Sequence, residues 1–298
     1  MGFGRGKVIL LGEHAVVHGY PAIALGIERG ASAEARVAER DRLLVPAWDI
    51  DLAPDPKSED PLARAFAVLL AQYEDRAPLE LRVQVELPAG AGLGCSAAVG
   101  VAVLDAIDEA LGIERSRQAH ADQYLEREKV FKGKPTGNDN NMSALGGVAL
   151  YRKGQGLVKL QPRRPLQLVV GYSGEPGSTK AMVASVERQL RADPARMRRD
   201  FEAVEILVRN ARAAIEAGDH RALGQLLDLN HSLLSGWMLC TTKLDAMCRA
   251  AREAGALGAK LTGGGGGGCM FALAADEESA KRIAEALGDD AFIAEVGT

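Results

Sequence analysis

The sequence has few aromatic residues and few cysteines. Phe, Trp and Tyr make up 4% of its 298 residues, so an apolar core must consist mainly of Ala, Val, Leu and Ile. The 4 cysteines are scattered and form no Cys-x-x-Cys pair, which argues against a zinc ribbon and against a small disulfide-stapled domain. This cysteine usage is typical of a reducing compartment, so we expect a cytoplasmic location.

The chain also lacks a long apolar run and an excess of basic charge. No apolar segment approaches the length of a membrane span, and the run at residues 8–11 is too short for the core of a signal peptide. The formal net charge is −4, and no lysine-rich tail is present. We therefore expect neither nucleic acid nor a membrane surface as a partner.

The composition and the order of elements predict two domains. Hydrophobic residues make up 47% of the chain, which is enough for a substantial core. Strands and helices mix in the first half, whereas strands flank a series of long helices in the second half, which favours an α+β sandwich there. Residues 161–165, with two prolines, are the expected linker between a domain of residues 1–162 and a second domain of residues 163–298.

The spacing of apolar residues predicts the individual elements. Helices are expected at residues 61–73, 97–111, 116–131, 178–190, 194–217, 220–235, 241–254 and 277–287. Strands are expected at residues 7–11, 21–25, 79–87, 147–151, 166–170, 269–274 and 291–296, while residues 259–262, before the glycine run, receive no assignment. Two polar segments, residues 46–60 and 133–141, are predicted as loops.

The most informative motif is PAGAGLGCSAA at residues 88–98, between a predicted strand and a predicted helix. A glycine loop in this position aims backbone N–H groups and the positive end of the helix at an anion, for which phosphate is the candidate. A plain glycine-rich turn is the alternative. The segment is not a Walker A loop, and Cys95 stands where the dinucleotide fingerprint requires Gly or Ala.

Three further segments combine ionisable residues or glycines at unusual density. GKVILLGEHAVVHG at residues 6–19 places Lys7 at the start of an apolar strand and Glu13 and His14 after its end. Residues 126–140 end in a Gly/Pro/Asn-rich loop that carries Asp139. An edge-strand lysine with a surface turn, and a turn-forming acid, are the ordinary alternatives for these two segments.

The third of these segments, KLTGGGGGGC at residues 260–269, contains six successive glycines. Ordering each of them costs about 1–2 kcal/mol of backbone entropy. A flexible linker is the alternative, but linkers do not usually separate a helix from an apolar strand inside a compact domain. The pattern therefore favours close approach of this backbone to a ligand or to another loop.

Together these segments resemble the superfamily of small-molecule kinases that includes galactokinase, homoserine kinase, mevalonate kinase and phosphomevalonate kinase. Within it they are most similar to the mevalonate kinases. GKVILLGEHAVVHGYPAIA resembles the first motif, PAGAGLGCSAA the phosphate loop, GKPTGNDN the catalytic loop, and AKLTGGGGGGC the third motif. GSTKAMV at residues 177–183 resembles a segment before the C-terminal helices, and the five matches occur in order over essentially the whole chain.

The resemblance implies a two-domain α+β kinase fold. The N-terminal domain would contain a βαβ unit and bind ATP, the C-terminal domain would be a ferredoxin-like α/β sandwich, and the active site would lie in the cleft between them. The implied reaction transfers the γ-phosphoryl group of ATP to the 5-hydroxyl of (R)-mevalonate, a step of isoprenoid biosynthesis, with Mg²⁺ as cofactor. Family members are often dimers, so the resemblance makes a homodimer possible, but the sequence itself does not give the oligomeric state.

Other readings are disfavoured by particular residues. Galactokinases carry an acidic-aromatic pair after Gly-Glu-His, where this chain has Ala15 and Val16. A phosphomevalonate kinase would need extra cations for a second phosphate, and the sequence does not show where they would be. A non-catalytic ATP-binding sensor would not need the catalytic set of Lys7, Ser96 and Asp139 together with Glu128.

The resemblance also assigns roles to individual residues. Asp139 corresponds to the catalytic aspartate, and Lys7 to the lysine that pairs with it and touches the substrate oxygen. Ser96 and Glu128 correspond to the Mg²⁺ ligands. The substrate site would comprise Lys7, Glu13, His14, Asp139 and Thr179. The ATP phosphates would be bound by the backbone of Gly90, Ala91, Gly92, Leu93, Gly94, Cys95, Ser96 and Ala97. Whether Asp139 accepts the proton or only orients the hydroxyl is left open.

Two positions depart from the family pattern. Cys95 replaces the first serine of a Ser-Ser pair, and sulfur is a weak hydrogen-bond donor and a poor Mg²⁺ ligand. Ser96 keeps the metal role. Gly264 stands where alanine is common in the third motif.

Overall fold

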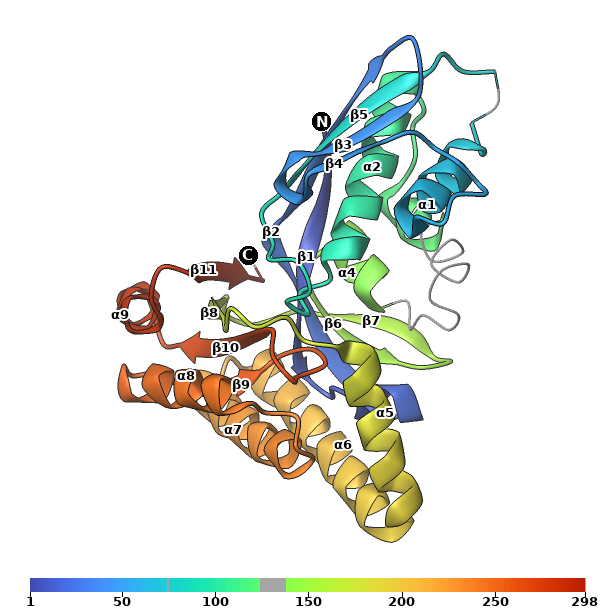
Figure 1. The fold of residues 1–298 in the computed structure, drawn as a ribbon. Coiled ribbons are helices and arrows are strands. Elements are labelled where there is room, and N and C mark those ends of the chain that lie inside the picture. The colour runs from blue at the N-terminus through green and yellow to red at the C-terminus, as the bar shows by residue number, and fades with distance from the viewer. Residues whose placement is uncertain (74, 124–137, 298) are drawn as a thin grey trace. The chain divides into compact units, whose positions relative to one another are not determined.

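The computed structural model describes residues 1–73, 75–123 and 138–297, and Figure 1 shows the course of the chain. The chain divides into two compact units, each assembled from three segments. Unit 1 contains Met1–Gly6, Arg29–Leu87 and Gly94–Gly146, and unit 2 contains Lys7–Glu28, Pro88–Leu93 and Gly147–Thr298. The domain boundary expected after residue 162 stays a prediction.

Unit 1 contains strands in the order β4-β3-β5-β2. Its strands are β2 (Ala22–Val37, of which Arg29–Val37 belongs to this unit), β3 (Arg42–Val45), β4 (Ile50–Leu52) and β5 (Leu79–Val85), together with the first half of β1 (Gly2–Leu11). β3 and β5 run parallel, and helix α1 (Pro61–Leu70) lies between them in the chain, so a βαβ unit is present. Helix α2 (Cys95–Leu111) packs against β5, and α4 (Asn138–Leu145) packs against α2 (Figure 1).

The first half of β1 lies directly on α2 because both elements carry small residues there. A methyl group on Gly4 would lie 2.0 Å from the carbonyl oxygen of Ala98, and one on Gly2 would lie 2.2 Å from that of Ala102. Any larger residue at these two positions would force the strand away from the helix. The alternate glycines at the start of the chain therefore serve close packing.

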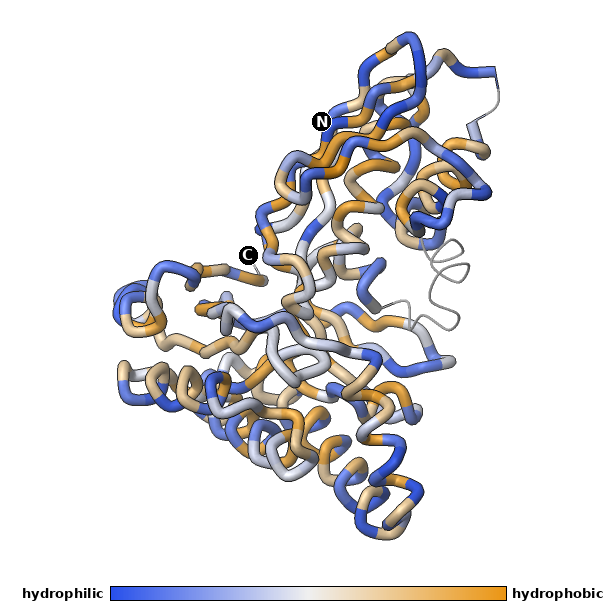
Figure 2. Tube along the Cα trace, in the orientation of Figure 1, coloured by the Kyte–Doolittle hydropathy of each residue, from blue (hydrophilic) through white to orange (hydrophobic). Residues whose placement is uncertain are grey.

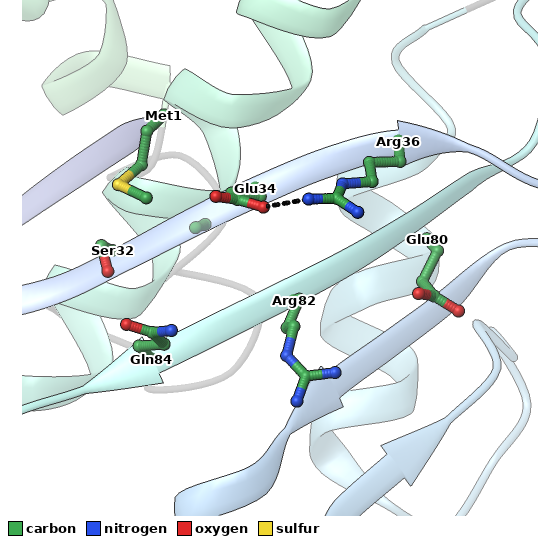
Figure 3. Close-up of a pocket in the computed structure, with 8 residues that line it drawn as sticks. Met1, Ser32, Glu34, Arg36, Glu80, Arg82 and Gln84 are labelled. Atoms are coloured by element: carbon green, nitrogen blue, oxygen red, sulfur yellow. Dashed lines mark hydrogen bonds and ion pairs between the residues drawn. The ribbon is translucent and has the colours of Figure 1, made fainter.

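The outer face of the β2–β5 pair forms a polar hollow (Figure 3). The strand register places Glu34 opposite Arg82 and Arg36 opposite Glu80, so opposite charges face each other across the strands. Ala33, next to Glu34 in the chain, is buried on the other face. We therefore interpret this hollow as the solvated face of an amphipathic sheet and assign no ligand to it. Its lining residues are Met1, Ser32, Ala33, Glu34, Arg36, Glu80, Arg82 and Gln84.

Unit 2 contains a second, four-stranded antiparallel sheet with the order β11-β8-β10-β9. Its strands are β8 (Leu166–Tyr172), β9 (Gly258–Leu261), β10 (Cys269–Ala274) and β11 (Ala291–Val296). Numbered along the chain, this order is 4-1-3-2, with helices between the first and second strands and between the third and fourth. This is the ferredoxin-like arrangement that the resemblance implied. In the same unit, β6 (Val148–Arg152) pairs with the start of β2 and with β7 (Gly156–Leu160).

The helices of unit 2 bury one face each. They are α5 (Thr179–Ala192), α6 (Pro194–Ala217), α7 (His220–Gly236), α8 (Thr242–Glu253) and α9 (Glu277–Leu287). α7 and α8 contact β9, and α8 and α9 contact β10, while α6 packs on α7. Their hydrophobic residues lie toward the sheet and toward neighbouring helices, with hydrophilic residues outside (Figure 2). No helix among the described residues is long and apolar enough to cross a membrane.

Side chains from α7 cover the open edge of β9, the last strand of this sheet. The N–H of Ala259 donates to a carboxylate oxygen of Asp228 over 3.0 Å, and the N–H of Leu261 donates to Nδ1 of His231 over 3.3 Å. Arg252 in α8 donates to the carbonyl of Ala259. Backbone groups that would otherwise be left unpaired at a buried edge are therefore satisfied, and β9 is fixed from both sides.

Most elements predicted from the spacing of apolar residues are confirmed, and α6, β10, α9 and β11 have the predicted bounds. The prediction of a loop at residues 46–60 was wrong in part, because a 3-10 turn (Pro46–Trp48) and β4 lie there. The strand β7 was missed, since it is short and carries Gly156 and Lys159 among its apolar residues. The loop prediction for residues 133–141 fails at its end, where α4 begins at Asn138, and residues 133–137 lie outside the described residues.

Helix α4 was missed because its first turn contains asparagine and aspartate residues, which favour turns and helix starts. The helix forms because Met142 and Ala144 are buried, and Ala144 packs with Val101 of α2. Tertiary packing therefore outweighs the low intrinsic helix propensity of this segment.

A buried carboxylate connects the helices of unit 1. Asp108 in α2 is 2% exposed and accepts a hydrogen bond from the hydroxyl of Tyr73 over 2.8 Å. Its second oxygen lies 2.7 Å from Nε of Arg115 and 2.8 Å from Nε2 of His120. One side chain thus joins the end of the α1 region, α2 and the helical residues 117–123.

We expect Asp108→Ala to lower the free energy of unfolding by about 3 kcal/mol, because it leaves a half-buried arginine, a buried histidine and a buried phenol without their acceptor. Urea denaturation at neutral pH measures this. Asp51→Ala is the control, since it removes the partner of Arg42 in an exposed ion pair and should leave stability nearly unchanged. Equal stability of the two variants would contradict a structural role for the buried network.

Candidate active site

In unit 2, the carbonyl groups of the glycine loop at residues 88–93 accept hydrogen bonds from three other segments. The carbonyl of Gly90 accepts from the N–H of Gly177 over 3.2 Å, and that of Ala91 accepts from Cys269 over 3.1 Å. The carbonyl of Leu93 accepts from the N–H of Lys7 over 2.8 Å. These three carbonyl oxygens are bonded inside the protein and do not face outward. This arrangement suits an anion site, because N–H groups and not carbonyls must face the anion.

The glycine run at residues 263–268 lies against this loop. A methyl group on Gly268 would lie 2.9 Å from the carbonyl oxygen of Ala91, and one on Gly263 would lie 3.1 Å from that of Gly92. On its other side, Gly265 would place a methyl group 2.5 Å from the carbonyl oxygen of Leu239. The six glycines are thus in contact with other backbone segments, as expected from their position in the sequence.

Lys7 lies in β1, where the strand meets the end of the glycine loop. Its side chain is 4% exposed. Two residues further along the strand, the N–H of Ile9 donates to the hydroxyl of Thr262 over 3.0 Å, and this hydroxyl donates to the carbonyl of Ile9 over 3.1 Å. These bonds attach β1 to the segment that leads into the glycine run.

The turn after β1 carries Glu13 and His14, and both side chains are buried. Nε2 of His14 lies 2.9 Å from the carbonyl oxygen of Gly264, so this nitrogen carries the ring proton. Burial lowers the pKa of His14, which keeps the ring neutral at physiological pH. The carboxylate of Glu13 forms an ion pair with Lys260, which sequence reasoning did not identify. The signal for it was a lysine inside a fully apolar strand.

Thr179 begins α5 and is exposed. A methyl group on Gly264 would lie 2.9 Å from both the Cα and the hydroxyl oxygen of Thr179. Gly264 is therefore adjacent to Thr179 on one side and hydrogen-bonded to His14 on the other. Unit 2 thus brings Lys7, Glu13, His14 and Thr179 together around the two glycine segments.

In unit 1, the first turn of α2 continues the glycine loop. Gly94 is the N-cap residue with φ of 72°, and Cys95, Ser96 and Ala97 follow. Ser96 is exposed, and its hydroxyl oxygen is a donor of the kind that Mg²⁺ prefers. Burial raises the pKa of Cys95 to about 11, so this side chain is a neutral thiol at physiological pH. A helix start without a capping side chain leaves N–H groups for an anion.

Unit 1 also holds Asp139, which lies in the first turn of α4 and is partly buried. The positive end of the helix favours the charged form of a carboxylate at this position. The second residue assigned to Mg²⁺, Glu128, lies outside the described residues.

Comparison with known proteins agrees with this geometry. Residues 61–147 match the model of the GHMP kinases N terminal domain, and residues 211–294 match that of the GHMP kinases C terminal domain. A mevalonate kinase of Pyrococcus horikoshii is 36% identical over 291 residues, which cover 90% of this chain and 86% of the relative.

Solved structures show the same relationship. The structure of L. major mevalonate kinase in complex with R-mevalonate has a TM-score of 0.88 and 28% identity, and the match covers 99% of this chain and 95% of the other. The Methanococcus jannaschii mevalonate kinase, 23% identical with a TM-score of 0.84, shows the same fold over 98% of this chain and 96% of its own. These similarities confirm the two-domain kinase fold, and the chain belongs to the GHMP kinases and, within them, to the mevalonate kinase family.

Proposed function

We propose that the protein transfers the γ-phosphoryl group of ATP to the 5-hydroxyl of (R)-mevalonate, with ADP and 5-phosphomevalonate as products. The observation that carries this proposal is the joint position of two glycine segments and the turn with Glu13 and His14. The first glycine segment bonds to Lys7 of β1, and the second bonds to His14. The first glycine segment suits the phosphates of ATP, and the adjoining turn offers polar groups for a small hydroxy acid. The mevalonate kinase relatives support the choice of acceptor.

In this proposal, the backbone N–H groups from Gly90 to Ala97, which include the N-terminus of α2, bind the phosphates of ATP. Because phosphoryl transfer needs mainly alignment and charge neutralisation, oriented N–H groups suffice for much of it. Ser96, with Glu128, would hold Mg²⁺, which neutralises charge on the phosphate oxygens when bound. The hydroxyl of Ser96 fits this role, whereas the neutral thiol of Cys95 does not.

The acceptor hydroxyl is oriented by Asp139, and the charge that develops on its oxygen is stabilised by the ammonium of Lys7. His14 donates its Nε2 proton to Gly264, so Nδ1 of the neutral ring is an acceptor for a substrate hydroxyl. Thr179, next to Gly264, supplies a second hydroxyl on the same side. A homodimer and a cytoplasmic location complete the proposal.

A coupled assay of ADP release over mevalonate, phosphomevalonate, galactose and homoserine tests the reaction directly. We expect turnover with mevalonate and little with the other three. Absence of turnover with mevalonate would refute the proposal, and turnover of another acceptor would identify a sibling kinase.

Asp139→Ala should lower kcat by at least about 10³-fold, because the hydroxyl loses its orienting carboxylate. Binding of mevalonate, measured by calorimetry, should be partly retained. Asp289→Ala removes an exposed carboxylate and is the control with unchanged kcat. Near-normal turnover by Asp139→Ala would remove this residue from the mechanism.

Gly268→Ala should raise KM for ATP by about 10-fold or more, since the new methyl group displaces the carbonyl of Ala91 and with it the phosphate loop. Gly112→Ala is matched in backbone conformation, with φ of 68° against 82°, but its methyl group would meet no atom within 4 Å. It should therefore share the loss of stability and leave KM for ATP unchanged. Similar KM values for the two variants would show that backbone strain, and not the contact with the loop, explains the effect.

A further inference from the structure

Lys260 is a charged residue in a strand that is otherwise apolar and entirely buried. Its side chain is 0% exposed. The ammonium forms the ion pair with Glu13, donates to the carbonyl of Leu261 over 2.7 Å and lies 5.3 Å from the centre of the Phe271 ring. A buried ammonium is tolerated only with such partners, and the carboxylate is the one that balances its charge.

The buried carboxylate of Glu13 likewise needs Lys260 to balance its charge. Its side chain is 0% exposed, and within the described part of the chain its second oxygen, Oε2, has no hydrogen-bond partner. Burial raises the pKa of Glu13, and Lys260 opposes this most strongly, with a smaller contribution from Lys7. Two cations therefore stabilise the charge of Glu13. Lys260 contacts the carboxylate directly, and Lys7 acts on it by electrostatic attraction.

Alternate residues of the segment 260–264 hold β1 and the turn after it. Lys260 binds Glu13, Thr262 bonds to both backbone groups of Ile9, and the carbonyl of Gly264 accepts from His14. Lys260 and Thr262 are two residues apart at the end of β9 and point to the same side, whereas Gly264 lies in the turn that follows and contributes a backbone carbonyl. Lys260 is the only charged member of this set.

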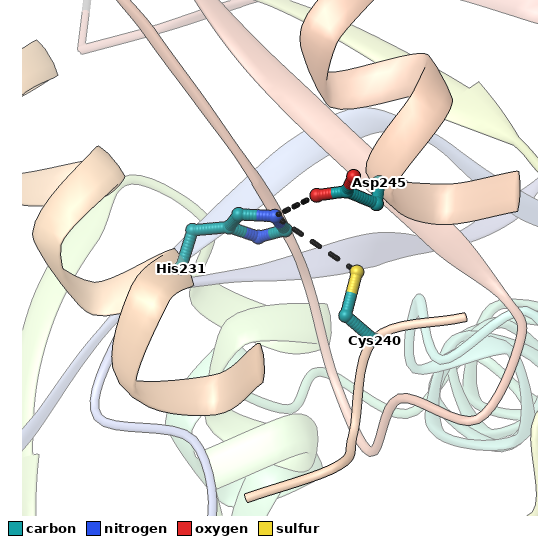
Figure 4. A group of neighbouring side chains, drawn as sticks. All are labelled: His231, Cys240 and Asp245. Atoms are coloured by element: carbon teal, nitrogen blue, oxygen red, sulfur yellow. Dashed lines mark hydrogen bonds and ion pairs between the residues drawn. The ribbon is translucent and has the colours of Figure 1, made fainter. Parts of the chain in front are cut away.

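The nearby group of His231, Cys240 and Asp245 offers three metal-ligating atoms within 4.8 Å of one another (Figure 4). However, Nδ1 of His231 accepts the N–H of Leu261, so the proton of the neutral ring is on Nε2. Nε2 is the atom that faces Asp245 and Cys240, and a protonated nitrogen cannot ligate a metal. We therefore interpret this group as a support for β9 and not as a metal site.

We propose that Lys260 is a positioning residue of the phosphoryl-transfer reaction, which neutralises the Glu13 carboxylate inside the protein and so fixes the turn at residues 12–14 beside Lys7. The proposal rests on the function assigned above. Without Lys260, the carboxyl group of Glu13 would either take up a proton or form an ion pair with Lys7. Both outcomes change the charge that Lys7 presents to the substrate oxygen.

A cycle of three variants tests this proposal: Lys260→Met, Glu13→Gln and the double variant. Lys281→Met is the control, because Lys281 forms an exposed ion pair with Glu277 outside the site. The measurements are kcat, KM for the acceptor and KM for ATP, with thermal unfolding to establish that each variant folds. The acceptor is mevalonate, or the substrate that the panel of four acceptors identifies, so a failure of the proposed function is seen separately.

Lys260→Met should lower kcat by about 30-fold or more. KM for ATP should change by less than about threefold, because the phosphate loop is held by other hydrogen bonds. Because Lys260 acts through Glu13, Glu13→Gln and the double variant should have the same kcat within about threefold. Lys281→Met should match the unchanged protein.

Two results would overturn the proposal. One is a folded Lys260→Met variant with unchanged kcat. The other is a double variant that regains the kcat of the unchanged protein. This result would show that the Glu13–Lys260 pair only supports the fold and does not act on the reaction. If Lys260→Met fails to fold, the double variant still decides, because it buries no unpaired charge. A kcat equal to that of Glu13→Gln, and well below that of the unchanged protein, then supports the proposal.

Discussion

The contact between two glycine-rich backbone segments, residues 88–93 and 263–268, is the constraint on which the site depends. Carbonyl oxygens of Ala91 and Gly92 lie where side chains on Gly268 and Gly263 would have to be. Because the segments touch through backbone, the carbonyls of Gly90, Ala91 and Leu93 accept hydrogen bonds inside the protein. The entropy lost in ordering so many glycines is large, and it is offset by contacts that no other residue allows.

β9 leads into the second glycine segment, and its Lys260 binds Glu13 in the turn that also carries His14. It is an edge strand, yet side chains of α7 and α8 bond to its outer backbone groups, so its position does not depend on a further strand. A buried ion pair such as Glu13–Lys260 is weak evidence for stability, because desolvation opposes the attraction. Its value here is geometric, since it allows one arrangement of the turn relative to β9.

The sequence predicted those features that depend on local patterns. Apolar periodicity predicted α6, α9 and both strands near the C-terminus, and the density of glycines predicted the close approach of the run at residues 263–268 to another backbone segment. The pairing of Glu13 with Lys260 could not be predicted, because 247 residues separate them and only the folded chain brings them together. For α4, local propensity favoured a loop, and burial of Ala144 against α2 decided otherwise.

The two departures from the family pattern act differently on the site. Cys95 is a neutral thiol, so it leaves the charge at the start of α2 as a serine would, and only its hydrogen bonding is weaker. Gly264 has a steric consequence, because an alanine methyl group there would lie 2.9 Å from Thr179. The start of α5 therefore lies closer to the glycine run than an alanine would permit. Since Gly264 also binds His14, this position couples the packing of α5 to the orientation of the imidazole.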